Sequence, residues 1–259
     1  MHYKAYAKVN IFLKIVGTRG NYHELVSRFM IVPSLFDTLS FVPKKSKEAF
    51  ELVGDFNCAL EHNTLYRTFM VLKSHGFAKE VERVMGMYAL QVSKNIPTGS
   101  GLGGGSSDSA TFLKMLNDVG NLGLSLEEMM KLGSEVGADV PFFASGYESA
   151  NVSGIGEIVE KYDEEVLNIE VITPKIKCNT GEIFKIFREK FYKTINTEDI
   201  KKLFNTKSKD ILLTYKIEEA NDLYLAASTV YEELKEFAKD NWFFSGSGSS
   251  FFRIIEDVK

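Results

Sequence analysis

The decisive stretch of the sequence reads Pro97-Thr98-Gly99-Ser100-Gly101-Leu102-Gly103-Gly104-Gly105-Ser106-Ser107-Asp108-Ser109-Ala110. Five of the seven residues at 99–105 are glycine, so few side chains keep a bulky anion away from the backbone. Glycine also permits the positive φ angles that turn several N–H groups toward one point. A helix is predicted to begin at Ser106, and a helix N-terminus favours negative charge. The stretch therefore predicts a polyphosphate site rather than a flexible linker, which would not lead directly into an apolar helix.

Three familiar nucleotide-binding patterns do not describe this loop. Residues 99–104 match the dinucleotide pattern GxGxxG in form. However, Pro97 interrupts the approach of a strand, and the nearest acidic candidate, Asp118, lies in the predicted helix. A Walker A loop needs a Gly-Lys pair, which the chain lacks. The DFG and HRD motifs of protein kinases are also absent. The loop is expected to belong to another class of phosphate site.

Length and composition narrow the classes of protein. The 259 residues suffice for one large or two modest domains, and 44% hydrophobic residues suffice for a packed core. The net charge is −4 and no basic patch is evident, so no nucleic-acid partner is expected. Cys58 and Cys178 form neither a metal spacing nor a disulfide framework, which favours the reducing cytoplasm. The apolar run Val9–Val16 is broken by Asn10 and Lys14, so neither a signal peptide nor a membrane association is expected.

Hydrophobic periodicity predicts the order of the elements. Strands are predicted at 3–16, 29–32, 38–42, 87–92, 169–173 and 251–255, and helices at 63–75, 106–116, 126–136, 182–191 and 220–239. Pro33 and Asp37 are expected to separate the second and third strands. Ser125 and Glu128 form a capping box, and Gly76 and Gly137 are expected helix stops. This order favours an α+β protein with mixed sheets over an alternating parallel sheet. Loose composition at 145–156 predicts a boundary between an N-terminal lobe, residues 1–150, and a C-terminal lobe, residues 151–259.

Three shorter stretches carry further polar residues suited to chemistry. They read Ala7-Lys8-Val9-Asn10, Gly137-Ala138-Asp139-Val140-Pro141 and Ser245-Gly246-Ser247-Gly248. Asp139 lies between a helix end and a proline, and its carboxylate could accept the proton of a hydroxyl group. Taken alone, it would be a turn residue equally often. Lys8 and Asn10 share one face of a strand. An ammonium beside a carboxylate would keep the carboxylate ionised, whereas an isolated lysine is by default a surface residue.

These stretches, in this order, resemble the GHMP kinases, a family of small-molecule kinases named for galacto-, homoserine, mevalonate and phosphomevalonate kinases. The loop at 101–107, GLGGGSS, and GADVP at 137–141 are highly specific, and SGSG at 245–248 resembles a late SGxG of the family. Tyr22-His23-Glu24-Leu25 resembles the YHxL signature of members that act on a cytidine diphosphate-linked methylerythritol. The resemblance runs from residue 5 to about 255. The chain departs from the family where Arg19–His23 is one residue shorter than RxDGYH, and where Ser109 replaces an alanine.

The resemblance implies a function and a set of site residues. The implied reaction is ATP-dependent phosphorylation of the 2-hydroxyl of that substrate, in non-mevalonate isoprenoid biosynthesis. The implied fold has a left-right pair of α/β lobes around a central cleft, with ATP in the N-terminal lobe and the substrate in the C-terminal lobe. Asp139 and Lys8 would be catalytic. ATP would contact Pro97, Gly99, Gly101, Leu102, Gly103, Gly104, Gly105, Ser106, Ser107, Asn63 and Lys94. The substrate would contact Asn10, Tyr22, His23, Asp139, Phe184, Gly246 and Gly248.

Mg²⁺ would accompany ATP, with Ser107 as the protein oxygen, and the protein is expected to be a monomer or a weak homodimer. Phe184 also has helical spacing with Phe187 and Phe191, which is typical of ordinary core. Two other functions stay open. One is a GHMP kinase of homoserine or mevalonate type, against which the YHxL signature argues. The other is a catalytically silent nucleotide sensor, against which the joint presence of Lys8 and Asp139 argues.

Overall fold

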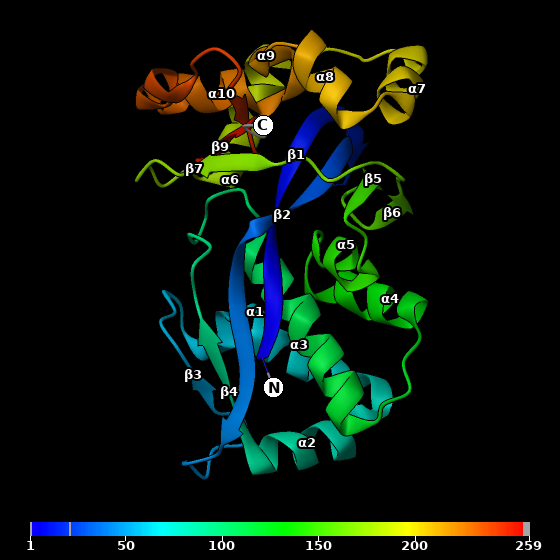
Figure 1. The fold of residues 1–259 in the computed structure, drawn as a ribbon, viewed down its shortest axis with the longest axis vertical. Coiled ribbons are helices and arrows are strands. Elements are labelled where there is room, and N and C mark those ends of the chain that lie inside the picture. Colours follow the sequence, from blue (N-terminus) through cyan, green and yellow to red (C-terminus); the bar gives the residue numbers. More distant parts are fainter. Residues whose placement is uncertain (1, 21, 256–259) are drawn as a thin grey trace. The chain divides into compact units, whose positions relative to one another are not determined.

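The computed structural model describes residues 2–20 and 22–255 (Figure 1). It contains two compact units, and the chain passes between them after residues 7, 34, 96, 103 and 146. Two long strands, β1 (His2–Arg19) and β2 (Tyr22–Pro43), each contribute residues to both units. The expected lobe boundary near residue 150 lies close to the last passage. The second unit differs from a contiguous C-terminal lobe, because it also includes Lys8–Ser34 and Pro97–Gly103.

The first unit packs helices against a small sheet (Figure 1). β4 (Tyr88–Ser93) pairs in parallel with β3 (Leu52–Val53) and antiparallel with the C-terminal part of β2. Leu39 and Leu90 on these strands join the apolar faces of the first three α-helices in one core. The helical elements of this unit are η1 (Leu60–His62), α1 (Thr64–Leu72), η2 (Lys73–Phe77), α2 (Ala78–Met87), α3 (Gly104–Gly120), α4 (Leu126–Val136) and α5 (Val140–Ser145).

Local sequence signals explain how these helices begin and end. Asn63 caps α1, because its Oδ1 accepts a hydrogen bond from Leu65 N at 2.9 Å. Ser125 and Glu128 form the predicted capping box at the start of α4. Gly76 has a φ of +95° between α1 and α2, which confirms a helix stop there.

The second unit has two sheets and a layer of short helices (Figure 1). The N-terminal part of β2 pairs antiparallel with β5 (Ser149–Gly154), which pairs with β6 (Ile158–Lys161). In the other sheet, β9 (Phe251–Ile254) lies between β7 (Ile169–Ile172) and β8 (Phe243–Phe244). The helical elements are α6 (Thr180–Ile186), η3 (Phe187–Phe191), α7 (Thr197–Asn205), α8 (Ser208–Thr214), α9 (Ile217–Ala220), α10 (Leu223–Val230) and η4 (Glu232–Phe237).

Two expectations for the secondary structure are wrong. The two strands expected on either side of Pro33 and Asp37 are one strand, β2. Pro33 lies between the part of β2 that pairs with β5 and the part that pairs with β4, so its missing N–H interrupts neither ladder. The long helix expected at 220–239 is interrupted at Tyr231, whose φ of −122° and ψ of 85° separate α10 from the 3₁₀ helix η4. The Asn221 side chain caps the start of α10, because its Oδ1 accepts from Leu223 N, and its Nδ2 donates to Phe244 O and Gly246 O.

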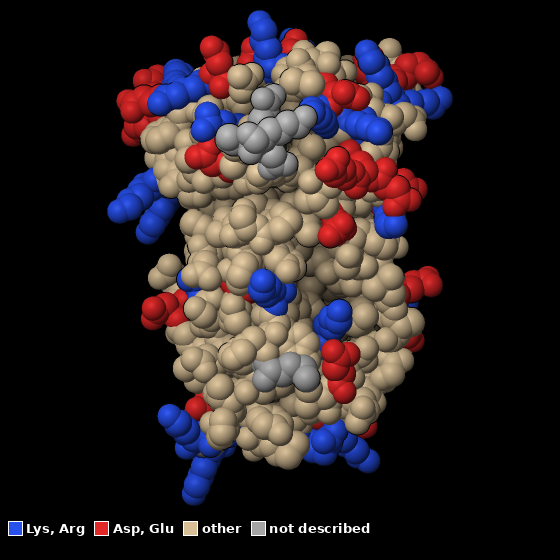
Figure 2. Space-filling model, in the orientation of Figure 1, with Lys and Arg blue, Asp and Glu red and all other residues tan. Residues whose placement is uncertain are grey.

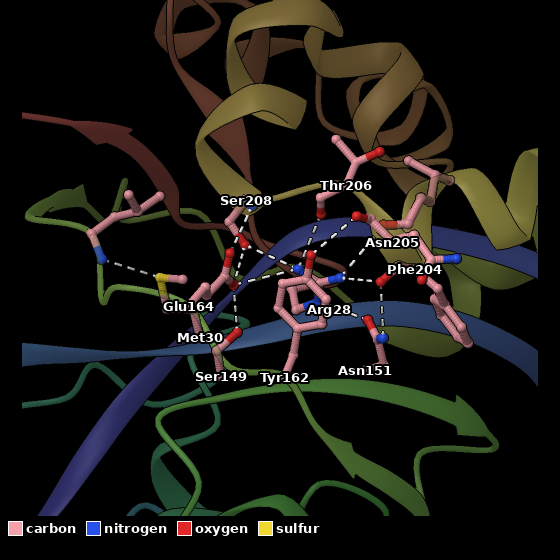
Figure 3. A network of polar contacts seen from close by, with 12 residues as sticks. Arg28, Met30, Ser149, Asn151, Tyr162, Glu164, Phe204, Asn205, Thr206 and Ser208 are labelled. Atoms are coloured by element: carbon pink, nitrogen blue, oxygen red, sulfur yellow. Dashed lines mark hydrogen bonds and ion pairs between the residues drawn. The ribbon is translucent and has the colours of Figure 1, made fainter.

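A fully buried arginine, Arg28 on β2, connects the sheet to the turn between α7 and α8 by hydrogen bonds (Figure 3). Its guanidinium donates to Phe204 O at 2.9 Å and to three further acceptors from 203–208 at 3.4 Å. It also donates to Asn151 Oδ1 at 2.7 Å, and its Cζ lies 3.4 Å from the centre of the Tyr162 ring. The buried Glu164 completes the network, 3.4 Å from Arg28 Nη1. Burial lowers the pKa of Arg28, and Glu164 opposes that effect. Carbonyl groups at the end of α7 are thereby satisfied without water.

Charged side chains of both signs are interspersed on the face of the molecule drawn in Figure 2. The exposed ion pairs of the protein include Lys201 with Glu198 at 3.1 Å and Arg253 with Glu170 at 2.6 Å. Pairs of this kind contribute about 0–1 kcal/mol each, so stability must come mainly from the cores and the buried network. In the part of the chain that is described, every helix is too short or too polar to cross a bilayer.

Candidate functional site

The glycine-rich stretch consists of a loop in the second unit followed by a helix in the first. In the loop, Gly99, Gly101 and Gly103 alternate in left-handed backbone conformation, with φ between 68° and 78°. A side chain on Gly101 would collide with the carbonyl oxygen of Ser245. The loop is also held through its backbone, because Ser250 N donates to Ser100 O at 3.0 Å. Positive φ and close backbone packing therefore both require glycine here.

The second small-residue loop supports the first. A Cβ on Gly246 would lie 3.3 Å from Gly101 O, and one on Gly248 would collide with the Phe244 ring. Ser247 Oγ lies 2.8 Å from Thr180 Oγ1 at the start of α6. The structure therefore gives both glycines a packing role, and their predicted substrate contacts stay predictions.

Helix α3 begins at Gly104, at the end of the glycine run. Gly105 O accepts hydrogen bonds from Thr64 Oγ1 at 3.1 Å and from Ser109 Oγ at 2.8 Å. Ser109, which replaces the alanine usual in the family, therefore bonds within α3 and lies outside the glycine loop. Ser107, the predicted metal ligand, is 2% exposed on the first turn.

Asp139 directly precedes α5, in which Pro141 occupies the first turn. Its backbone is held by a turn in which Val140 N donates to Gly137 O at 3.1 Å. Val140 also packs so closely on α4 that a Cβ on Gly133 would lie 2.8 Å from its side chain. The Asp139 side chain makes no capping hydrogen bond to α5. The motif thus places a half-buried carboxylate on a stiff turn without using it as a helix cap.

Lys8 and Asn10 lie side by side within β1, and both are buried, with 3% and 2% exposure. Lys8 Nζ donates to Asn10 Oδ1 at 2.6 Å and to Gly101 O at 3.2 Å. Its ammonium also lies 4.5 Å from the centre of the Phe29 ring. Lys8 is therefore a buried cation bound to the glycine loop and not a surface lysine.

Three aromatic residues predicted for the substrate lie in the second unit. The His23 and Phe184 rings stack, with centres 4.6 Å apart and planes at 25°. His23 Nε2 is buried and has no hydrogen-bond partner. Burial, reinforced by the charge of Arg188, lowers the pKa of His23, so the neutral imidazole predominates near pH 7. The Tyr22 side chain is 65% exposed. Asn21, where the chain is one residue shorter than the family motif, lies outside the described residues.

Lys94 belongs to a charged cluster that the sequence analysis did not identify. Its ammonium pairs with Asp37 and with Asp108 Oδ2, the latter at 2.6 Å. Nζ also lies 3.5 Å from where a Cβ on Gly104 would be, beside the start of α3. Burial alone would lower the pKa of Lys94, but the carboxylates, Asp108 foremost, raise it. Burial raises the pKa of Asp108 to about 7 despite Lys94.

The cluster predicts a pH-dependent stability. Folded Asp108 keeps its proton up to about pH 7, whereas the unfolded side chain releases it near 3.8. The folded state therefore binds more protons in this range, and its stability is expected to fall as pH rises from about 4 to about 7. Asp108→Asn cannot titrate and should lose this fall. Urea denaturation at pH 5 and pH 8 measures it, with the exposed Asp118→Asn on the same helix as control. Parallel profiles for wild type and Asp108→Asn would contradict the expectation.

The predicted site residues thus fall into two groups. Within the second unit, Lys8 and Asn10 lie with Gly101 and Gly246, and His23 lies with Phe184. Within the first unit, Lys94 lies beside Gly104. Asn63 also belongs to the first unit, with its Oδ1 occupied by the cap of α1. Sequence reasoning missed Asp37 and Asp108. Asp108 stands inside the glycine motif itself, which was the available signal.

Comparisons with known proteins identify the family. A model described as the N-terminal domain of GHMP kinases matches residues 63–147. A 4-diphosphocytidyl-2-C-methyl-D-erythritol kinase from Sulfurimonas denitrificans is 55% identical over 257 residues, 98% of this chain and 97% of its own. The kinase of the same name from Helicobacter pylori is 39% identical, covering 97% of this chain and 96% of its own.

Solved structures agree with these sequence relatives. A crystal structure of a 4-(cytidine 5'-diphospho)-2C-methyl-D-erythritol kinase matches with a TM-score of 0.73 and 29% identity, over 99% of this chain and 90% of that chain. The mevalonate kinase of Methanococcus jannaschii matches with a TM-score of 0.62 and 16% identity, over 99% and 91%, which supports the fold alone. The expected α+β fold is confirmed. The chain belongs to the GHMP kinases and, within them, to the 4-diphosphocytidyl-2-C-methyl-D-erythritol kinases.

Proposed function

We propose that this protein transfers the γ-phosphoryl group of ATP to the 2-hydroxyl of 4-diphosphocytidyl-2-C-methyl-D-erythritol, in the non-mevalonate route to isoprenoid precursors. The observation that carries the proposal is 55% identity, over 98% of the chain, to a kinase of that name. The buried Lys8, the stiff turn at Asp139 and the left-handed glycine loop support a working kinase rather than a silent nucleotide sensor.

Phosphoryl transfer passes through a loose transition state, so positioning and charge neutralisation dominate its catalysis. In the proposal, Asp139 accepts the proton of the attacking hydroxyl. Lys8 offsets the negative charge that develops on the attacking oxygen. Lys8 Nζ donates to Asn10 Oδ1 and Gly101 O, and these contacts place its positive charge beside the glycine loop.

ATP would bind at the glycine stretch, with backbone N–H groups of residues 99–105 and the start of α3 toward the phosphates. The remaining proposed contacts are Pro97, Leu102, Ser106, Asn63 and Lys94. Mg²⁺ would neutralise phosphate charge. Among the described residues, no three His, Cys, Asp or Glu side chains gather to hold a metal ion. This suits an ion held mainly by phosphates and water, with the Ser107 hydroxyl as the protein ligand.

The cytidine end of the substrate is assigned to Tyr22, His23 and Phe184, and further substrate contacts to Gly246 and Gly248, all of them residues of the second unit. The exposed Tyr22 ring offers a face on which a pyrimidine can stack. The neutral His23 carries a nitrogen without a partner, which suits a hydrogen bond to a base edge. We place the protein in the cytoplasm, in keeping with its free cysteines, as a monomer or weak homodimer.

A panel of alcohols tests this function. Initial rates with equal ATP and Mg²⁺ are measured for the cytidine diphosphate-linked methylerythritol, free methylerythritol, homoserine and mevalonate. The linked substrate is expected to be turned over, and free methylerythritol to react very poorly, because binding of the remote cytidine group positions the hydroxyl. Faster turnover of homoserine or mevalonate would refute the specific assignment. ATP binding without turnover of any alcohol would favour the sensor.

A further inference from the structure

Ser27, on β2, is a completely buried serine that none of the motifs includes. Its hydroxyl donates a hydrogen bond to the carbonyl oxygen of Phe12 on β1. Ser27 Oγ itself accepts a hydrogen bond from Asn10 Nδ2 at 3.0 Å. Ser27 therefore lies one contact away from Asn10 and two contacts away from the Lys8 ammonium.

The three hydrogen bonds that connect Phe12 O, Ser27, Asn10 and Lys8 have a fixed direction. A carbonyl oxygen can only accept, so the single proton of Ser27 is directed to Phe12 O. The remaining lone pairs of Ser27 require a donor, which selects the NH₂ end of the Asn10 amide. The Asn10 oxygen then faces Lys8 Nζ at 2.6 Å. With the amide reversed, NH₂ would face the ammonium, and the Asn10 oxygen would face Ser27 without a proton between them.

This orientation determines where the Lys8 charge is held. The ammonium donates to Asn10 Oδ1 and to Gly101 O, so it is fixed between β1 and the glycine loop. Ser245 Oγ donates to Gly101 O at 3.0 Å and restrains the loop side. All four polar side chains involved are buried, with exposures from 0% to 3%. In such surroundings an unsatisfied polar group is costly, so the alternative orientation is strongly disfavoured.

We infer that Ser27 is a positioning residue for phosphoryl transfer, because it selects the end of the Asn10 amide that holds Lys8. The inference rests on the proposed role of Lys8 in the reaction. Loss of the Ser27 hydroxyl leaves Asn10 Nδ2 without its buried acceptor, so the amide and the ammonium that it holds can shift from this position. The effect should fall on kcat more than on KM, since the proposed contacts with ATP and with the cytidine end of the substrate do not involve Ser27.

The test is a double-mutant cycle on kcat. Ser27→Ala is expected to lower kcat roughly 10- to 100-fold, the loss typical of a misplaced catalytic group. In the Asn10→Ala background, Ser27→Ala should have almost no further effect, because the amide that it orients is absent. Ser27→Thr keeps the hydroxyl and should retain most of the activity. Ser228→Ala is the control, because Ser228 is a buried serine of α10 that bonds only within its own helix.

Three outcomes would decide the question. Multiplicative losses from Ser27→Ala and Asn10→Ala, or wild-type kcat in Ser27→Ala, would overturn the positioning role. Lys8→Met reports on the proposed role of Lys8 separately: full activity in that variant would refute that role and the inference with it. Circular dichroism and urea denaturation confirm folding, and Ser27→Cys, nearly equal in volume with a weaker donor, replaces Ser27→Ala should the latter not fold.

Discussion

Replacing Asp139 by asparagine is expected to lower kcat by roughly 10²–10⁴-fold, the range for a lost general base, while folding and ATP binding persist. An amide cannot accept the proton of the attacking hydroxyl. The φ and ψ of −86° and −10° are ordinary for asparagine, and no helix cap is lost, because the Asp139 side chain does not cap α5. Steady-state kinetics give kcat, and calorimetric titration gives the ATP affinity.

The control for this variant is Asp163→Asn, because the Asp163 side chain is 84% exposed and pairs with Lys161 at the surface. Asp163→Asn removes the same negative charge, and Asp163 is separated in the sequence from every predicted site residue. This variant should therefore leave kcat unchanged. Near-native turnover by a folded Asp139→Asn protein would remove Asp139 from the role of base. Loss of ATP binding together with kcat would indicate that Asp139 acts on the nucleotide site instead.

Replacing Arg28 by methionine is expected to destabilise the protein by about 3–5 kcal/mol, the cost of removing one partner from a buried ion pair. Glu164 would stay buried without its cation, and carbonyl groups at the end of α7 would lose their donor (Figure 3). Arg28→Lys should not restore stability. A lysine ammonium has three N–H donors where the guanidinium has five, and it has no planar face to stack on the Tyr162 ring. Urea denaturation measures the free energy of unfolding.

Arg253→Met is the matched control, since this arginine also pairs with a glutamate but is 45% exposed. Its loss should cost about 1 kcal/mol or less. The double variant Arg28→Met/Glu164→Gln should be more stable than Arg28→Met alone, because the uncompensated charge is gone. A free energy of unfolding of Arg28→Met within about 1 kcal/mol of wild type would contradict the expectation.

Features encoded by short stretches of sequence could be predicted. The capping box at Ser125, the apolar face of β1 and the positive φ angles of the glycine loop depend on neighbouring residues. GADVP at 137–141 was predictable for the same reason, since its turn and proline are local. The structure agrees with the sequence at these points because local preference and tertiary packing favour the same conformation.

Features built from distant residues could not be predicted. Asp37 appeared to interrupt a strand, but it is buried and pairs with Lys94 across 57 residues of sequence. Arg28 contacts groups as far away as Ser208, and nothing beside it in the sequence indicates them. Such contacts are set by the topology of the sheet and not by the local pattern.

The course of β1 and β2 through both units has a consequence for how the protein can be dissected. No single cut of the chain separates the units, because each is assembled from segments interleaved with those of the other. A fragment ending near residue 150 would leave the second unit without the parts of β1 and β2 that build its sheet and core. The C-terminal half is therefore not an autonomous folding module. A ligand that binds one unit should raise the melting temperature of the whole chain, since melting of either unit breaks strands that the other needs.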